Sequence, residues 1–172
     1  MIIYNGRLHL SFPLSNTYIG DGAGSVNTDG SENLFIGYNS GYLNSTGYYN
    51  TFLGAFSGYS NTGGFGNVFA GYNSGAANST GMANSFFGHY SGSTNGTGSF
   101  NSYFGENSGS SSTGSNNSFF GAEAGLSLTS GSNNILLGYK AGKNLTTGSG
   151  NIIIGNDLDA PAADAGNKLV IG

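Results

Sequence analysis

The stretch Asn50-Thr-Phe-Leu-Gly-Ala-Phe-Ser-Gly58 is the unit from which most of the chain is built. Close copies of it begin at Asn33, Asn67 and Asn84. When each leading Asn is counted as position 1, the unit returns every 17 residues, with shorter steps of 16 after Asn101 and after Asn151. A fixed period of this length is the signature of a repeat protein made of stacked, equivalent coils.

Asn and Gly hold fixed places in this unit. The leading Asn is Asn16, Asn33, Asn50, Asn67, Asn84, Asn101, Asn117, Asn134 and Asn151, with a tenth copy at Asn167. Position 5 is Gly20, Gly37, Gly54, Gly71, Gly88, Gly105, Gly121, Gly138 and Gly155. Gly at position 5 predicts a tight turn with φ > 0 or a close backbone approach. Stacked Asn side chains predict a ladder of hydrogen bonds along the array, and a row of ligand-binding amides is the alternative use of these residues.

Composition and charge narrow the class of protein. The 172 residues carry a net charge of −4, and only 7% are charged. Lys and Arg are too few and too scattered for the basic footprint that nucleic-acid binding requires. No apolar run approaches the ~20 residues of a membrane helix, so neither nucleic acid nor membrane insertion is expected. The chain has no Cys, which excludes disulfides and thiolate metal sites.

The repeat predicts an all-β fold. A chain this rich in Gly is unsuited to helices, and although its Gly, Ser and Asn content is typical of flexible linkers, apolar pairs recurring in register give each repeat something to bury. Each unit predicts a short strand over positions 1–4, a Gly turn, a second short extended segment near positions 6–8, and a corner ending in Thr-Gly. The expected fold is a β-solenoid of about nine coils over residues 16–159, a rod of roughly 40–45 Å at ~4.8 Å per coil.

Positions 3 and 4 of the unit are both apolar, as in Phe52-Leu53 and Phe86-Phe87. Adjacent residues of a strand point to opposite faces, so each strand has two apolar faces. One face can fill the interior of the coil. The other needs a cover, and an identical subunit is the simplest one.

The two ends differ from the array. Residues 1–15 are expected to form an N-terminal cap or connecting strand, since Arg7-Leu-His-Leu-Ser-Phe12 alternates polar and apolar residues. Residues 160–172 are expected to close the array, because Leu158 replaces the usual small residue of position 8 and Asn167–Gly172 predicts a last strand. That strand is apolar and lacks a polar cap, so a following domain or another protein is expected to cover it.

The pattern N-[TS]-[FI]-[LIF]-G-x-x-[AS]-G, with spacers such as Thr146-Thr-Gly-Ser-Gly-Asn151, resembles the Gly/Asn-rich repeats of bacteriophage tail fibre and tail-needle-like proteins. Asn151–Pro161 and Gly166–Gly172 are similar to the closing segment of such arrays, which often precede a self-cleaving chaperone domain. A looser likeness is to the head repeats of trimeric autotransporter adhesins, which are shorter and form a left-handed β-roll. Over residues 16–172 the resemblance implies a parallel homotrimer with a left-handed β-roll-like solenoid, in a virion-borne or otherwise extracellular attachment fibre.

Chemistry is sparse in this sequence. Asp157 and Asp159 could share one face of a strand, but they fall in a turn, where Asp is common. His9 and His89 are far apart and have no partner at metal-ligand spacing. No Ser/His/Asp set can be assigned by role, and the calcium-binding solenoid pattern G-G-x-G-x-D is absent. We therefore expect no catalytic residues, no cofactor, no metal and no enzyme activity.

Aromatic residues are the remaining functional signal. The candidate contacts for a host receptor or glycan are Tyr38, Tyr42, Tyr48, Tyr49, Tyr59 and Tyr72. Phe56, Tyr90 and Tyr139 also occupy variable positions of the unit, and the densest cluster is residues 38–59. Aromatic rings are favoured in recognition surfaces, and packing between coils or subunits is the alternative role for them.

The sequence thus favours a structural and attachment module of a trimeric phage tail fibre, a rigid rod that presents a receptor-binding surface. Its expected partners are two further copies of the chain, a host-cell surface receptor and other fibre or virion components at both ends. The alternatives are a bacterial surface adhesin and a subunit of a self-stacking extracellular filament. An ice-binding solenoid needs a flat Thr array, and position 2 is too irregular for one, running from Thr17 to Leu34 and from Ser118 to Ile135.

Overall fold

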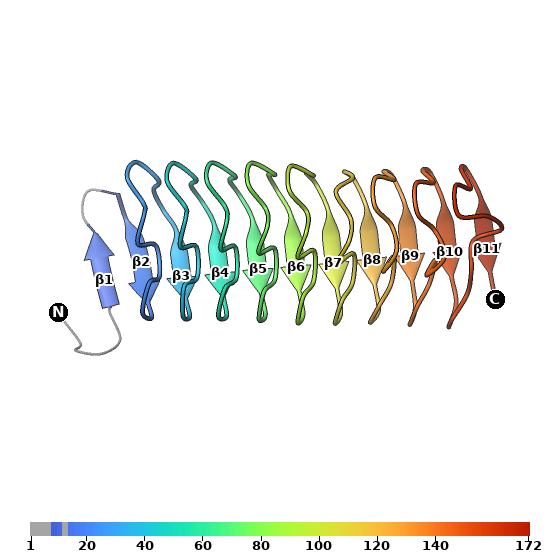
Figure 1. Ribbon diagram of the computed structural model, residues 1–172, viewed down its shortest axis with the longest axis horizontal. Coiled ribbons are helices and arrows are strands. Elements are labelled where there is room, and N and C mark those ends of the chain that lie inside the picture. The colour runs from blue at the N-terminus through green and yellow to red at the C-terminus, as the bar shows by residue number, and fades with distance from the viewer. Residues whose placement is uncertain (1–7, 12–13) are drawn as a thin grey trace.

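One sheet runs the length of an elongated molecule, with a single strand from each coil (Figure 1). The computed structural model describes residues 8–11 and 14–172. The strands are β1 Leu8–Ser11, β2 Asn16–Ile19, β3 Leu34–Ile36, β4 Thr51–Leu53, β5 Val68–Ala70, β6 Ser85–Phe87, β7 Ser102–Phe104, β8 Ser118–Phe120, β9 Ile135–Leu137, β10 Ile152–Ile154 and β11 Leu169–Ile171. Strands β2 to β11 are parallel and follow chain order, so the predicted β-solenoid of about nine coils is confirmed.

Each coil contains one strand, and the second extended segment that the sequence predicts near positions 6–8 is wrong. Position 7 has a left-handed backbone in every coil, as at Phe56 with φ 57. Ser57 N–H donates to the Gly54 carbonyl at 3.2 Å, which closes a turn directly after the strand. A left-handed residue reverses the chain direction, and this is incompatible with an extended segment.

The pairing register is one full coil, so equivalent residues lie side by side. Phe35 pairs with Phe52, and Ile152 pairs with Leu169. The second of these pairs places Lys168 at position 1 of the last coil, and the prediction of Asn167 there is wrong. Lys168 N–H donates to Asn151 Oδ1 at 3.1 Å, whereas Asn167 has φ 56. Asn tolerates the left-handed region, which explains why an Asn stands one place before the strand.

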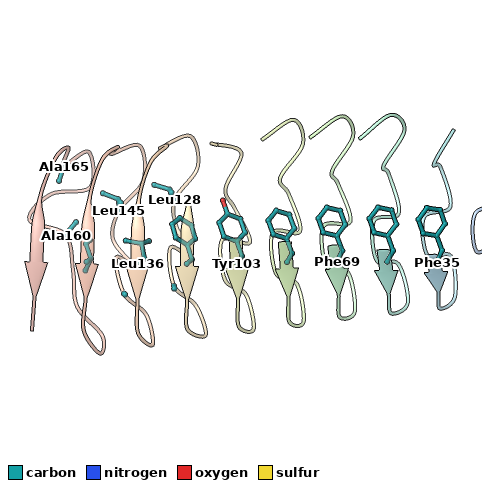
Figure 2. Packing of buried hydrophobic residues seen from close by; sticks show 14 of the residues in the cluster. Phe35, Phe69, Tyr103, Leu128, Leu136, Leu145, Ala160 and Ala165 are labelled. Carbon is teal, nitrogen blue, oxygen red and sulfur yellow. The ribbon is translucent and has the colours of Figure 1, made fainter. Parts of the chain in front are cut away.

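Stacked rings fill the interior of the coils (Figure 2). Position 3 points inward, and its aromatic members are Tyr18, Phe35, Phe52, Phe69, Phe86, Tyr103 and Phe119. Neighbouring centroids lie 4.6–5.1 Å apart with interplanar angles of 5–11°. The coil spacing sets this distance, because rings attached to in-register strands stack at the strand separation. Leu136 and Ile153 continue the column.

The leading Asn side chains lie inside the coil and link each coil to the next. Asn67 Nδ2 donates to the Gly81 carbonyl of its own coil at 2.9 Å, and Asn67 Oδ1 accepts the backbone N–H of Asn84 at 2.9 Å. Both groups are buried, so the amide pairs two backbone groups that water cannot reach.

A second Asn ladder, not anticipated from the sequence, lies at position 12. Its members are Asn27, Asn44, Asn61, Asn78 and Asn95. Here the amides bond to each other, as in Asn78 Nδ2 to Asn61 Oδ1 at 2.7 Å. The ladder ends where Ser112 replaces the next Asn, and Leu128 and Leu145 occupy the position in the following coils.

Gly at positions 5 and 9 permits close approach between coils and rings. A Cβ on Gly71, where φ is 138, would collide with the carbonyl of Gly88 in the next coil. A Cβ on Gly75, where φ is 59, would collide with the Phe69 ring. These two glycines therefore set both the coil spacing and the tight fit of the core.

The ends of the sheet are formed by different strands. Strand β1 pairs antiparallel with β2, with Ser11 opposite Asn16, so part of the N-terminal segment covers the first coil. At the other end, β11 adds to the same sheet, and the segment after residue 159 continues the stack. Ala160 and Ala165 are buried in its interior.

Candidate functional surfaces

The outer face of the sheet has apolar residues at position 4 and Ser, Thr or apolar residues at position 2, and no other part of residues 8–11 and 14–172 covers it. Positions 2 and 4 of each strand point outward, opposite the buried position 3. Leu53, Phe87 and Leu137 of position 4 are 37–45% exposed. Neither column contains a charged residue in any of the ten parallel strands. We call this surface the sheet face.

The middle of the sheet face has a ridge beside a trough. Strands β6, β7 and β8 each read Ser-x-Phe. Phe87, Phe104 and Phe120 stack at 4.8 Å with interplanar angles of 5–7°, forming the ridge. The small Ser column at position 2 runs parallel to it. A large column beside a small one is the shape that lets two such faces interdigitate.

A group of aromatic rings occupies the turns that follow the strands. Its members are Tyr38, Tyr42, Phe56, Tyr59, Tyr72, His89 and Tyr90, which we call the turn cluster. Phe56 lies between two tyrosines and meets both edge to face, Tyr38 at 5.3 Å and Tyr72 at 6.0 Å, each with an interplanar angle of 87°. Tyr38 is 52% exposed and Tyr72 is 43% exposed.

Two of the six predicted contact residues lie elsewhere. Tyr48 and Tyr49 precede strand β4, whereas the turn cluster follows the strands. Tyr48 stacks on Phe65 at 4.7 Å and meets Tyr49 at 5.1 Å. The sequence-based set therefore divides into two groups, of which Tyr38, Tyr42, Tyr59 and Tyr72 belong to the larger. The sequence analysis did not include His89 among the contact residues. Its place at position 6, which Tyr38 and Tyr72 also occupy, could have indicated that it belongs to the turn cluster.

Two aromatic residues of the turn cluster have a backbone that bulky side chains rarely adopt. Phe56 has φ 57 and Tyr90 has φ 55, both at position 7. Asn39, Asn73 and Asn107 fill the same position in neighbouring coils. Asn is among the residues that enter the left-handed region most readily, and a bulky residue there is an outlier. Asn would therefore fit the left-handed backbone of position 7 with less strain than Phe56 or Tyr90 does.

The aromatic surface lies in a stretch without charge. Residues 33–105 contain no Asp, Glu, Lys or Arg, although they hold 17 of the 23 Phe and Tyr residues. Residues 106–172 contain eight charged residues and three Phe or Tyr. His89 Nδ1 and Glu106 Oε1 approach to 3.7 Å at the border of the two stretches.

In the part of the chain that the structure describes, acidic and basic side chains meet as single pairs. No group of three or more His, Cys, Asp or Glu lies close enough there to hold a metal ion, and no helix in residues 8–11 and 14–172 is long and apolar enough to cross a membrane. Asp157 accepts a hydrogen bond from Lys143 Nζ at 2.7 Å, and both side chains are largely exposed. Burial raises the pKa of Tyr103 to about 12, and its hydroxyl bonds to Ser112 Oγ at 3.0 Å.

Comparison with known protein families, with characterised proteins and with solved structures finds no significant match.

Proposed function

We propose that the chain is a structural and attachment module of a trimeric phage tail fibre, a rigid rod that presents a host-receptor-binding surface. The repeat pattern resembles that of tail fibres, and the observation that carries the proposal is the uncharged apolar sheet face. A face of this kind along the whole length of a rod is suited to burial against copies of the same chain.

The size of the sheet face fits an assembly. Five side chains of position 4 are 37–45% exposed, namely Ile19, Leu53, Phe87, Phe120 and Leu137, and position 2 adds Ile135 and Ile152 at 45% and 37%. They are spread over strands β2 to β10, so a partner lying along the rod would bury apolar surface from most of the coils.

Native mass by light scattering tests the assembly. Three chains of 17.4 kDa give a particle of about 52 kDa. Phe104→Glu would place a charge in the middle of the sheet face and is expected to yield a 17.4 kDa monomer with an unchanged β-type circular dichroism spectrum. Ser111→Glu is the matched control, since Ser111 is exposed outside the sheet. A monomeric wild type, or a trimer that survives Phe104→Glu, would contradict the proposal.

The second candidate is a bacterial surface adhesin or a subunit of a self-stacking extracellular filament. Strand β11 favours it, because among the described residues it pairs with β10 alone, and Leu169 and Ile171 are 67% and 68% exposed. Exposed strand edges pair readily with other strands. Electron microscopy of concentrated protein should then show filaments in the wild type and none in Ile171→Pro. Gly172 N–H donates to the Ile154 carbonyl of β10, and successive N–H groups of a strand point to opposite sides, so Pro at position 171 removes a donor from the open edge.

A further inference from the structure

We propose that the turn cluster binds an uncharged, linear saccharide chain. This inference rests on the proposed attachment function and names the chemical class of the receptor. The cluster lies in the turns that follow strands β3 to β6, at the lower ends of these coils in Figure 1. Assembly through the sheet face leaves these turns accessible, because they lie beyond the strands rather than on them.

The spacing of the rings suits a ligand that repeats along a line. Tyr38 and Tyr72 both occupy position 6, two coils apart, which corresponds to roughly 9.6 Å at the strand spacing. Ala55 holds the same position in the coil between them, where the Phe56 ring meets both tyrosines edge to face. The C–H groups on the face of a sugar ring carry partial positive charge and stack on the negative face of an aromatic ring. Successive sugars of one chain can therefore meet successive rings.

Polar groups in the same turns match sugar hydroxyls. The tyrosine hydroxyl is both a donor and an acceptor, and a side-chain amide offers two donors and an acceptor. Asn39 and Asn73 follow Tyr38 and Tyr72 directly at position 7, and both are partly exposed. A sugar stacked on these rings would find hydrogen-bonding groups beside it.

Charge identifies the saccharide as neutral. The cluster lies inside residues 33–105, which contain no Asp, Glu, Lys or Arg. A ligand with carboxylate, sulfate or phosphate groups is recognised through Arg or Lys, and the charged residues at the two ends of the cluster are acidic: Asp21, at position 6 of the coil before Tyr38, and Glu106 beside His89. An acidic saccharide would lose its hydration at this surface without gaining an ion pair.

The composition of the turns favours a sugar over a protein partner. Between residues 38 and 93, positions 6, 7 and 10 contain aromatic, Asn, Ser and Ala residues, with no Arg, Leu, Ile or Met. Hot spots of protein interfaces are enriched in Arg as well as in Tyr and Trp. Aromatic rings with small amides and hydroxyls, repeated at a fixed step, are matched to a polymer of identical units.

The fold does not require these rings, which argues that they are retained for binding. Phe56 and Tyr90 adopt the left-handed backbone that Asn39 and Asn107 adopt in sister coils. Strained residues persist where function holds them. Replacing the aromatic residue by Asn should therefore improve the local backbone and weaken the binding surface at the same time.

Affinity electrophoresis and calorimetry with neutral and acidic oligosaccharides test the proposal. The probes are cello-, malto- and chito-oligosaccharides of six units and a polygalacturonate hexamer. We expect the wild type to bind at least one neutral probe and to leave the acidic probe unbound. Tyr38→Ala combined with Tyr72→Ala should weaken binding by tenfold or more. Tyr139→Ala is the matched control, because Tyr139 holds position 6 at 46% exposure but lies outside the cluster, and it should bind like the wild type.

Phe56→Asn with Tyr90→Asn supplies a second, independent readout. This variant should lose neutral-saccharide binding while its melting temperature stays equal or rises, which a merely structural role of the rings would not produce. Binding of no neutral probe, stronger binding of the acidic probe, or equal binding by the Tyr38/Tyr72 variant would overturn the proposal. Light scattering on the same samples separates the two hypotheses: a trimer without saccharide binding refutes this inference alone, whereas a monomer that binds saccharide refutes the fibre assembly alone.

Discussion

The coils of residues 33–105 and those of residues 106–172 have the same backbone and different side chains. In the first stretch the interior contains stacked rings and the second Asn ladder, and the surface is aromatic and uncharged. In the second stretch Leu136 and Ile153 follow Phe119 in the column of position 3, and Leu128 and Leu145 replace the second Asn ladder; Figure 2 labels Leu128, Leu136 and Leu145. Ion pairs such as Lys143–Asp157 lie on the surface.

Gly and the leading Asn therefore determine the backbone of the coil, whereas aromatic and aliphatic side chains can replace each other in its interior. Gly71 and Gly138 have nearly the same φ, 138 and 127, in the two stretches. Asn67 and Asn134 make the same bonds to the next coil. Because the second stretch forms the same coil with only two exposed rings in its described residues, Phe120 and Tyr139, the fold does not explain the aromatic surface of the first.

The largest expected effect comes from removing a leading Asn, and it should differ between the stretches. Asn134→Ala would leave two buried groups unpaired, the Asn151 N–H and the Gly148 carbonyl, since Leu145 offers no donor. We expect a loss of roughly 3–5 kcal/mol in the free energy of unfolding.

Asn67→Ala is the counterpart in the aromatic stretch. It would also orphan a backbone N–H, but the Gly81 carbonyl keeps its bond from Asn78 Nδ2 at 3.1 Å. We expect a loss of roughly 2–3 kcal/mol. Urea denaturation of both variants checks the difference, with Asn156→Ala as an exposed control. Equal losses in the free energy of unfolding would show that the hydrogen bond from Asn78 to the Gly81 carbonyl does not compensate for the missing Asn67 side chain.

The next largest effect is expected when one coil of the aromatic stretch receives the aliphatic interior residues of the second stretch. Phe69→Leu would break two stacks, with centroid distances of 4.9 and 4.8 Å, and leave a void that we expect to cost about 2 kcal/mol. Position 12 lies at the tip of the ring, as the bond from Tyr103 to Ser112 shows. Asn78→Leu should therefore fill part of the void, as Leu128 does in the aliphatic interior.

A double-mutant cycle by urea denaturation measures this coupling. The double variant Phe69→Leu with Asn78→Leu should lose about 1 kcal/mol less than the two single losses together. Strict additivity would mean that the two interiors are not interchangeable within one coil. Leu53→Ala, on the outer face of the neighbouring strand, is the control that should add independently to either change.

The period of the sequence was enough to predict the β-solenoid, since the pattern of Asn, Phe and Gly repeats with one strand per coil. The second extended segment was predicted wrongly because the left-handed residue at position 7 varies from Asn39 to Phe56 and Lys140, and only Gly or Asn would have signalled a turn. The last register was misread at Asn167 for a related reason, as Asn serves both the ladder and the left-handed position before it.

The aromatic surface was predicted in part. The density of aromatic residues in the sequence identified the stretch around Tyr38 and Tyr59. It could not show that Tyr48 and Tyr49 lie apart from the turn cluster, because the distance between turns depends on how the coil closes. The second Asn ladder escaped notice since it stops after Asn95 and lacks the regularity of the first. Neither the class of receptor nor the oligomeric state follows from the period of the sequence, which determines only which residues of successive coils lie side by side within one chain.

A smaller effect is expected at Tyr103, where the two interiors meet. Its ordinary pKa of 10.0 is raised to about 12, mainly by burial. The neutral phenol thus contributes stability that is complete below pH 10 and is lost as pH rises towards 12. Tyr103→Phe should be about 1 kcal/mol less stable at pH 7, through loss of the bond to Ser112, and more stable than the wild type at pH 12. Denaturation from pH 7 to 12 measures the crossing, and parallel curves would refute it.

The smallest expected effect tests whether the charges of the second stretch stabilise the coil at all. The hydrogen bond from Lys143 lowers the pKa of Asp157 below its ordinary 3.8, so its contribution is present above pH 3.8 and is lost as pH falls further. Asp157→Asn keeps a residue suited to the left-handed φ of 54. It should differ from the wild type only slightly at pH 7, and not at all at pH 2 or in 1 M salt, because exposed ion pairs are screened. A difference that persists at pH 2 would mean that Asp157 acts through the turn backbone instead, and the charges would then belong to the fold as firmly as the glycines do.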